Sequence, residues 1–306
     1  MSNMQDGVDD ARQSSTPFSL QFLTLGHVTR DLHPDGSFSL GGTVTFAALT
    51  AYRLGLVTGI VTCASSDILK ELPYALPDIT LRMRPTAETT TFINQYKQGF
   101  RTQYLYARAD DLRITDVPLS WRHAPIVLLG PLAQEIPPDI VALFQRRPDA
   151  IIAATPQGWL RRWDGDGRVW PTPWATVEQI LPLLDVLILS HDDLLPFANG
   201  NRLEADAMLH EWSTRVPLLV ATDGRHGAIL FQQGAVQHFP AYSVQEVDPT
   251  GAGDVFAAAF LVALYKYRDA EYAVKFANCV ASFSIEREGV QGIPTMAIVE
   301  ARMRMG

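Results

Sequence analysis

Residues 248–254 of this chain, DPTGAGD, combine the residue types that phosphate chemistry needs, and an apolar run follows at once over residues 255–263. Gly251 and Gly253 let the backbone approach a ligand closely, and with Ala252 they open a predicted helix whose free N–H groups carry the positive end of its dipole. Asp254 stands in the first turn, where a carboxylate can accept a proton from a hydroxyl nucleophile. The stretch therefore indicates phosphoryl transfer, with Asp254 as the candidate general base. An ordinary glycine-rich turn before a helix is the structural alternative.

The composition sets the class of protein that must position these residues. The chain has 306 residues, of which 47% are hydrophobic and 19% charged, and this balance predicts a compact globular α/β protein with a full core. A formal net charge of −8 argues against a nucleic-acid or anionic-membrane surface. Cys63 and Cys279 stand alone, so neither a disulfide framework nor a zinc site is indicated.

The ends and the apolar windows of the chain bear on its location. Residues 1–18 are polar and acidic without the pattern of a signal peptide, and we expect a disordered tail there. Apolar windows such as 124–132 and 181–189 are too short to span a bilayer. The sequence predicts a soluble, cytoplasmic protein.

Short apolar runs alternate with helical patterns along most of the chain, which predicts buried parallel strands joined by crossover helices. The expected strands are 22–28, 56–63, 126–130, 150–154, 186–190 and 218–222, and the expected helices include 41–55, 253–266, 270–287 and 296–303.

Two regions interrupt this alternation. Residues 79–106 read as three strand-like stretches around the turn Lys97-Gln98-Gly99, and they predict an antiparallel flap on one edge of the main sheet. Residues 228–231, 235–239 and 242–247 predict a second group of short strands around Gln233-Gly234, which leads directly into the DPTGAGD stretch.

The DPTGAGD stretch with its apolar helix closely resembles the C-terminal signature D-T-x-G-A-G-D of the ribokinase/PfkB family of carbohydrate and nucleoside kinases, with Pro249 in place of the usual Thr. The resemblance implies an α/β, three-layer ribokinase-like fold with a mostly parallel central sheet and a small β lid. It implies a single kinase domain over residues 19–306, with the lid built from about 79–107 plus a short segment near 36–41. It also implies ATP and Mg²⁺, and a monovalent cation such as K⁺ near Asp248 and Thr250.

Further matches extend the resemblance to the acceptor side. Gly41 and Gly42 occupy the place of the family's Gly-Gly pair at the start of the first helix, and Asp31 matches an Asp that binds sugar hydroxyls. A carboxylate accepts hydrogen bonds from vicinal hydroxyls, and glycines let a small polyol reach backbone amides. A turn-forming Asp and a tight helix entry are equally good explanations of these residues on their own.

On the donor side, the sequence TDGRHG over residues 222–227 resembles the family's T-x-G-x-x-G element. The resemblance assigns Thr222, Gly224 and Gly227 to the nucleotide phosphates and Asn278 to the adenine, whereas a plain hairpin turn and a solvent-facing Asn are the alternatives. Ser190 and Asp193 stand where many members have N-x-x-E, which orders the magnesium and its waters. A helix-capping box explains the same two residues.

One departure concerns the acceptor. Phe46 stands where ribokinases place an Asn that contacts sugar hydroxyls, so an aromatic wall replaces an amide. Together with the segments 89–92, 130–132 and 156–161, this change resembles the myo-inositol kinase-like branch. That branch implies a cyclic polyol as acceptor, with Phe46 or Trp159 against a ring face and with Asp31, Gln157 and Arg161 toward hydroxyls. Trp159 is more typical of packing.

The leading hypothesis is thus an ATP-dependent sugar or cyclic-polyol kinase. A nucleoside kinase is the nearest alternative, and a nucleotide-binding regulator with degenerate kinase chemistry is a third, since Ser190, Asp193 and Phe46 all depart from the family. A dinucleotide-dependent dehydrogenase is disfavoured because the first strand lacks G-x-G-x-x-G. The expected partners are the acceptor and ATP, in a monomer or a homodimer, with neither nucleic acid nor membrane.

Overall fold

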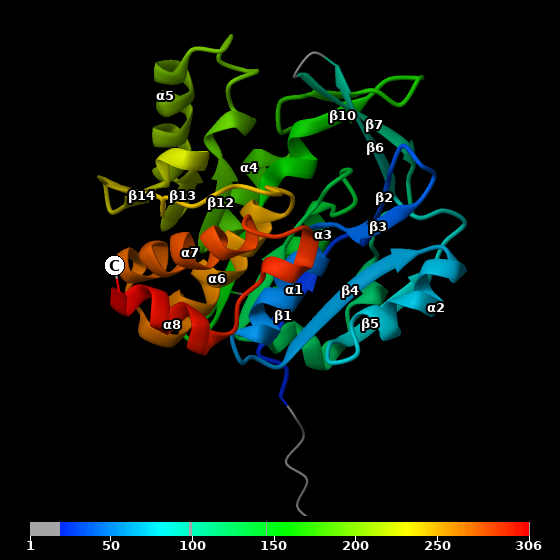
Figure 1. The fold of residues 1–306 in the computed structure, drawn as a ribbon, viewed down its shortest axis with the longest axis horizontal. Helices are drawn as coiled ribbons and strands as arrows, with labels where there is room; N and C mark the ends of the chain where they lie inside the picture. Colours follow the sequence, from blue (N-terminus) through cyan, green and yellow to red (C-terminus); the bar gives the residue numbers. More distant parts are fainter. Residues whose placement is uncertain (1–18, 98–99, 145, 306) are drawn as a thin grey trace, which may run out of the picture.

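The computed structural model describes residues 19–97, 100–144 and 146–305. A 9-stranded sheet runs through the molecule (Figure 1), in the order β15 (Ala235–Phe239), β14 (Ala228–Gln232), β13 (Leu218–Thr222), β12 (Val186–Ser190), β9 (Ile151–Ala154), β8 (Ile126–Leu129), β1 (Phe22–Leu25), β4 (Thr58–Ala64) and β5 (Thr80–Pro85). The strands from β13 to β5 are parallel, and β14 and β15 add an antiparallel edge. The mostly parallel central sheet is confirmed.

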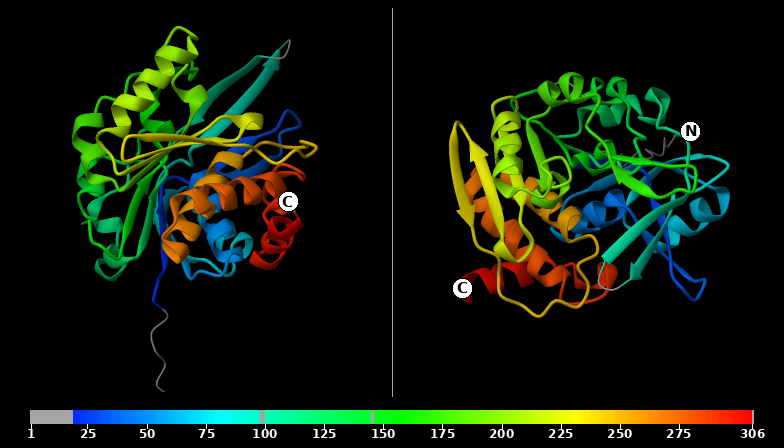
Figure 2. Two further views of the ribbon diagram at one scale, coloured as in Figure 1. Left: turned by 90° about the vertical axis from the view of Figure 1, so that its left-hand side faces the viewer. Right: turned by 90° about the horizontal axis from the view of Figure 1, so that it is seen from above.

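Helices cover both faces of this sheet, which explains why its inner strands are apolar on both sides. Figure 2 shows the two helical layers on opposite faces. One face carries α1 (Thr43–Arg53), α2 (Ser66–Ala75), α6 (Ala252–Tyr267), α7 (Ala270–Ser284) and α8 (Met296–Met305). The other carries α3 (Pro138–Val141), α4 (Val177–Ile180) and α5 (Arg202–Ser213). Helix α6 is apolar around most of its circumference because it is buried between the sheet and its neighbouring helices.

A separate 4-stranded sheet forms the lid, in the order β3 (Phe38–Gly41), β2 (Thr29–Leu32), β6 (Thr91–Lys97) and β7 (Phe100–Ala107). The predicted lid boundaries are wrong in two respects. Residues 80–85 form β5, which pairs parallel with β4 in the main sheet, and residues 29–41 supply two lid strands where only a short segment near 36–41 was expected. The alternating pattern of β5 arises because it is an edge strand with partly exposed side chains. Residues 98–99 of the predicted turn lie outside the described residues, as do residues 1–18.

Two short hairpins complete the architecture. Strands β14 and β15 turn at Gln233 and Gly234, which both have positive φ (51° and 80°), as the sequence predicts. The third strand expected at 242–247 does not form, because Val247 and Asp248 donate to the carbonyl of Ile285 beyond α7. An unpredicted hairpin joins β10 (Arg161–Trp163) to β11 (Val169–Pro171). No described helix is long and apolar enough to cross a membrane.

Candidate active site

Asp254 lies in the first turn of α6. Its carboxyl is half-buried and closely surrounded by protein atoms, and this desolvation raises its pKa to about 6. A hydrogen bond from Thr43 and the positive charge of Arg161 oppose that rise, while the negative charges of Asp193 and Asp31 add to it. The structure therefore brings four residues of the predicted site, Asp31, Arg161, Asp193 and Asp254, within electrostatic reach of one another.

The predicted anion cradle has the backbone geometry that it requires. Gly251 is the N-cap of α6 with φ 75° and ψ 1°, a left-handed conformation that favours glycine. A Cβ at position 251 would lie 2.4 Å from Cδ1 of Phe46, whereas a Cβ at Gly253 would meet open space. Phe46 is only 4% exposed and belongs to the core cluster. Its ring thus supports the cradle from below, and it is not an open wall for a ligand.

The Gly-Gly pair lies against Asp31, as the predicted acceptor site requires. A Cβ at Gly41 would lie 2.3 Å from Oδ2 of Asp31, so only glycine leaves room for this carboxylate. Gly42 is the N-cap of α1, with φ 93°. Thr43, the next residue, donates to Asp254 and was not singled out from the sequence. Its place directly after the glycine pair is the only sequence signal that would have found it.

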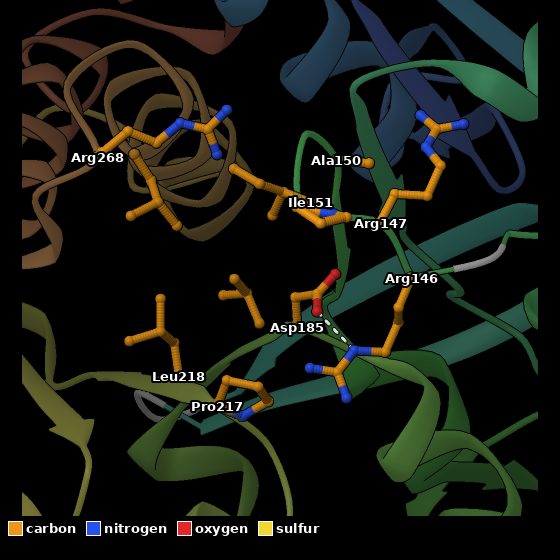
Figure 3. Close-up of a pocket in the computed structure, with 11 residues that line it drawn as sticks. Arg146, Arg147, Ala150, Ile151, Asp185, Pro217, Leu218 and Arg268 are labelled. Atoms are coloured by element: carbon orange, nitrogen blue, oxygen red, sulfur yellow. Dashed lines mark hydrogen bonds and ion pairs between the residues drawn. The ribbon is translucent and has the colours of Figure 1, made fainter.

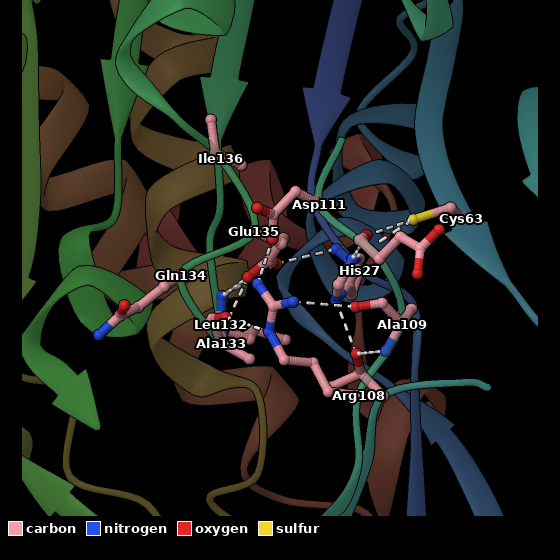
Figure 4. Close-up of polar contacts among 12 residues, drawn as sticks. His27, Cys63, Arg108, Ala109, Asp111, Leu132, Ala133, Gln134, Glu135 and Ile136 are labelled. Carbon is pink, nitrogen blue, oxygen red and sulfur yellow. Dashed lines mark hydrogen bonds and ion pairs between the residues drawn. The ribbon is translucent and has the colours of Figure 1, made fainter. Parts of the chain in front are cut away.

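A second residue that the sequence reasoning missed is Glu135, which is fully buried (Figure 4). Its carboxylate accepts hydrogen bonds from the backbone N–H groups of His27, Leu132 and Ala133 at 2.7–3.0 Å. This carboxylate joins the end of β1 to the loop after β8, and it holds both beside the acceptor site. A lone Glu within the apolar run GPLAQEIP was the available signal.

His27 extends the same network toward the lid. One ring nitrogen lies 2.6 Å from Oγ1 of Thr90, and the other lies 2.9 Å from the carbonyl of Asp110. Burial lowers the pKa of His27, so the ring is neutral at physiological pH. The network is structural in its contacts, and it fixes the backbone from which Asp31 projects.

The residues expected on the donor side lie at the ends of β12, β13 and the following hairpin. The capping box predicted for Ser190 and Asp193 is confirmed: Asp193 Oδ2 accepts from the N–H of Ser190 at 3.0 Å. Desolvation raises the pKa of Asp193. Thr222 ends β13, and Gly224 and Gly227 have φ of 49° and 99° in the turn that follows.

Asn278 is buried in α7 and does not face solvent. Its amide nitrogen donates to the carbonyls of Phe239 and Pro240 at 3.3 and 3.1 Å, so its contact with an adenine would have to use the side-chain oxygen.

Asp248, which was expected with Thr250 near a monovalent cation, joins the loop before α6 to the loop after α7. It accepts hydrogen bonds from the N–H groups of Thr250 and Gly289, both at 2.9 Å. Partial burial acts to raise the pKa of Asp248, but these hydrogen bonds lower it overall. Among the described residues there is no group of three or more His, Cys, Asp or Glu side chains that would chelate a metal by itself.

Two cavities differ in their relation to this site. One, of about 280 Å³, is lined by Gln157 and Arg161, both predicted for the acceptor, and by Asp193. A larger one, of about 500 Å³, lies at the opposite edge of the sheet, where β9, β12 and β13 begin (Figure 3). There Arg146 donates to Asp185 at 2.7 Å. The smaller cavity adjoins the candidate site, because Arg161 and Asp193 line it and both act on Asp254, which is not itself among the lining residues.

Residues 161–296 match the family described as pfkB family carbohydrate kinase. Over these residues, this chain is similar to the pfkB family carbohydrate kinases. The matched stretch includes the cradle and Asp254, and the match begins at Arg161. The resemblance to the ribokinase/PfkB family is thereby confirmed.

Relatives with known names agree with this family. The chain is 31% identical over 168 residues to a probable fructokinase-5 of Arabidopsis thaliana, a match that covers 51% of this chain and 52% of that one. It is 27% identical to a fructokinase of Escherichia coli over 80% of this chain and 85% of that protein. The match thus spans only about half the length of the plant fructokinases.

Solved structures of similar fold superpose on more than nine-tenths of this chain. A pyrophosphate-dependent kinase of the ribokinase family, complexed with a pyrophosphate analog and myo-inositol, superposes with a TM-score of 0.76 at 23% identity, over 92% of this chain and 99% of that one. A ribokinase from Thermotoga maritima gives a TM-score of 0.69 at 23% identity, over 93% and 99%. At this identity the likeness confirms the ribokinase-like fold predicted from the sequence.

Proposed function

We propose that this protein is a kinase that transfers the γ-phosphoryl group of ATP to a hydroxyl of a sugar or cyclic polyol, acting in the cytoplasm. One observation carries the proposal: Asp254, with its raised pKa, lies in the first turn of the helix whose N-cap, Gly251, has the left-handed backbone that an anion cradle requires. Asp31 and Arg161 approach the same carboxyl. These interactions support the proposal that Asp254 acts as the base beside a phosphate cradle and hydroxyl-binding groups.

In the proposed reaction, the hydroxyl oxygen of the acceptor forms a bond to the γ-phosphorus of ATP. Asp254 accepts the proton of that hydroxyl. The bond from that phosphorus to the bridging oxygen breaks, and the negative charge of the leaving ADP remains on its phosphate. The N–H groups of residues 251–253 stabilise the transferring group. Asp31 orients the acceptor, and Arg161 keeps the charged form of Asp254 accessible by lowering its pKa.

Mg²⁺ would neutralise phosphate charge when it is bound with the nucleotide. Asp193 would contribute only through a water, because burial disfavours its charged form and Ser190 already occupies one of its oxygens. A K⁺ ion would be held near the backbone carbonyls of Asp248 and Thr250, between the two loops that Asp248 joins. A rate that stays constant as KCl rises from zero to saturation, in sodium-free buffer, would remove the K⁺ assignment.

The donor and the acceptor are best tested together. ATP and pyrophosphate would each be offered with fructose, ribose, myo-inositol and a panel of nucleosides, and the phosphorylated product would be measured. Pyrophosphate is included because a kinase with this fold is described as pyrophosphate-dependent. Product with a nucleoside alone would favour the nucleoside kinase. Nucleotide binding without any transfer would favour a regulator.

Replacement of Asp254 tests the base directly. We expect Asp254→Asn to lower kcat by about 100-fold or more while the Kd for ATP changes little, because the amide cannot accept the proton. Asp139→Asn, an exposed change in α3, is the matched control and should leave kcat unchanged. A kcat within about tenfold of wild type for Asp254→Asn would contradict the assignment.

A further inference from the structure

The hairpin of residues 161–171, here called the strap, connects the catalytic residues to the lid. It begins at Arg161, whose charge acts on Asp254 and Asp193. At its other end, the N–H of Leu105 in β7 donates to the carbonyl of Gly167 at 2.7 Å, and Tyr104 forms an antiparallel bridge with Arg168. Figure 1 shows β10 beside β6 and β7. The strap is a 2-stranded sheet of its own, and an isolated bridge and a main-chain hydrogen bond attach it to β7 of the lid.

Side chains reinforce this connection. Trp163 and Val169 of the strap pack against an apolar cluster that includes Phe92 and Leu105 of the lid, together with Leu132 of the loop after β8. The guanidinium of Arg108 lies 5.6 Å from the ring centre of Trp163. Apolar packing and main-chain hydrogen bonds thus hold lid and strap together as one unit.

The strap and the lid both contribute side chains to the open cavity of about 280 Å³. Thr102 and Gln103 line it from β7, Gln157 and Arg161 from the base, and Arg168 and Trp170 from the far side of the strap. The volume is at the small end of ligand cavities. Two arginines and two aspartates, Asp192 and Asp193, line the cavity, so its formal charge balances.

The far wall of this cavity is held in a fixed arrangement. The guanidinium of Arg168 lies 4.0 Å from the ring centre of Trp170, and the indole N–H donates to Oδ2 of Asp164 at 2.8 Å. The backbone N–H of Arg168 donates to the same carboxylate at 3.0 Å. A stacked guanidinium directs its N–H groups sideways, where hydroxyl oxygens can accept them.

We propose that the strap forms the far wall of the acceptor site and restricts the acceptor to a compact, uncharged, polyhydroxylated ring. Arg168 donates to hydroxyls on the side of the ring away from Asp254, and Trp170 limits its size. This inference rests on the proposed kinase activity. It adds that monosaccharides and cyclitols fit, while nucleosides and disaccharides are too large.

Variants of the strap test the inference with fructose, ribose and myo-inositol as acceptors. We expect Arg168→Ala to raise the acceptor KM about tenfold, because charge-assisted hydrogen bonds to the acceptor are lost. The KM for ATP should stay within about twofold of wild type. Trp170→Ala should raise the rate with adenosine or sucrose relative to the best small acceptor. Arg162→Ala is the control, because Arg162 is exposed on β10, the other strand of the strap, and does not line the cavity.

Calorimetric titration of each variant with the same acceptors separates the two proposals. An acceptor that binds wild type but is not phosphorylated overturns the kinase activity alone, and weaker binding to Arg168→Ala still supports the strap. Acceptor KM and Kd unchanged in both Arg168→Ala and Trp170→Ala overturn the strap alone. If wild type neither binds nor phosphorylates any acceptor of the panel, both proposals fail.

Discussion

The residues around Asp254 form a set of coupled charges. The pKa of the Asp254 carboxyl is about 6, because burial raises it by more than Thr43 and Arg161 lower it. The negative charges of Asp193 and Asp31 raise it further. A base with such a pKa is largely ionised at neutral pH and still holds a proton well. Each neighbour therefore contributes a shift of known sign to the reactivity of one group.

The pH dependence of the reaction should report these signs. We expect kcat/KM to rise with pH and to level off above a pKa of about 6, since the base must be ionised. Asp193→Asn removes a charge that raises the pKa of Asp254, so the acidic limb should move to lower pH. Arg161→Gln should move it to higher pH. The same limb in all three proteins would mean that another group limits the rate.

Stability should show the converse dependence. The pKa of Asp254 is higher in the folded protein than its ordinary 3.8, so protonation favours folding. This contribution is fully present below pH 3.8 and is lost as pH rises through about 6. Asp254→Asn should therefore raise Tm at pH 8 and change it little at pH 4. A lower Tm for the variant at pH 8 would contradict this account.

Much of this constellation could be predicted from the sequence at the level of single residues. The DPTGAGD stretch and the Gly-Gly pair could be predicted because each is a run of consecutive residues, in which the glycines and the turn that needs them lie side by side in the sequence. Thr43 and Glu135 could not be found in this way. Their roles depend on groups distant in the chain, and Glu135 is identified only by the backbone N–H groups that surround it.

Among the elements, the strap depends on one glycine. Gly167 has φ 80°, and a Cβ there would lie 2.5 Å from the carbonyl oxygen of Leu105. Gly165, two residues earlier, has open space around it. The lid and the strap therefore meet at a position that tolerates no side chain.

We expect Gly167→Ala to lower the free energy of unfolding by about 1–3 kcal/mol through backbone strain and the lost contact with β7. Its acceptor KM should rise as the strap detaches. Urea denaturation and steady-state kinetics measure both effects, and Gly165→Ala should differ from wild type by less than about 0.5 kcal/mol. Equal stability of the two variants would show that strap and lid are not joined as described.

The main strands could be predicted because their apolar runs are continuous, but β5 and the strap could not. Strand β5 alternates in polarity, as an isolated flap would, and only its register with β4 assigns it to the main sheet. Strands β10 and β11 have three residues each, too few for a pattern to emerge. Their antiparallel pairing with each other defines them.

At the scale of the whole molecule, the two thiols report on the core. Cys63 and Cys279 are both free and fully buried, and burial raises the pKa of Cys63 to about 12. Neither should react with a disulfide reagent at pH 8 in the folded protein, because a buried thiol that stays protonated is inert. Both should react in denaturant. Labelling of the native protein without loss of structure would show that the core opens more readily than its packing implies.

The contact between Phe46 and Gly251 links two choices that natural selection would otherwise make separately. The ring of Phe46 fills the space into which any side chain at position 251 would project. A lineage that exchanged Phe46 for a smaller polar residue, in order to recognise another acceptor, would remove the support beneath its phosphate cradle. We therefore expect the choice of acceptor and the affinity for the phosphate donor to change together during evolution, because the Phe46 ring lies directly against Gly251.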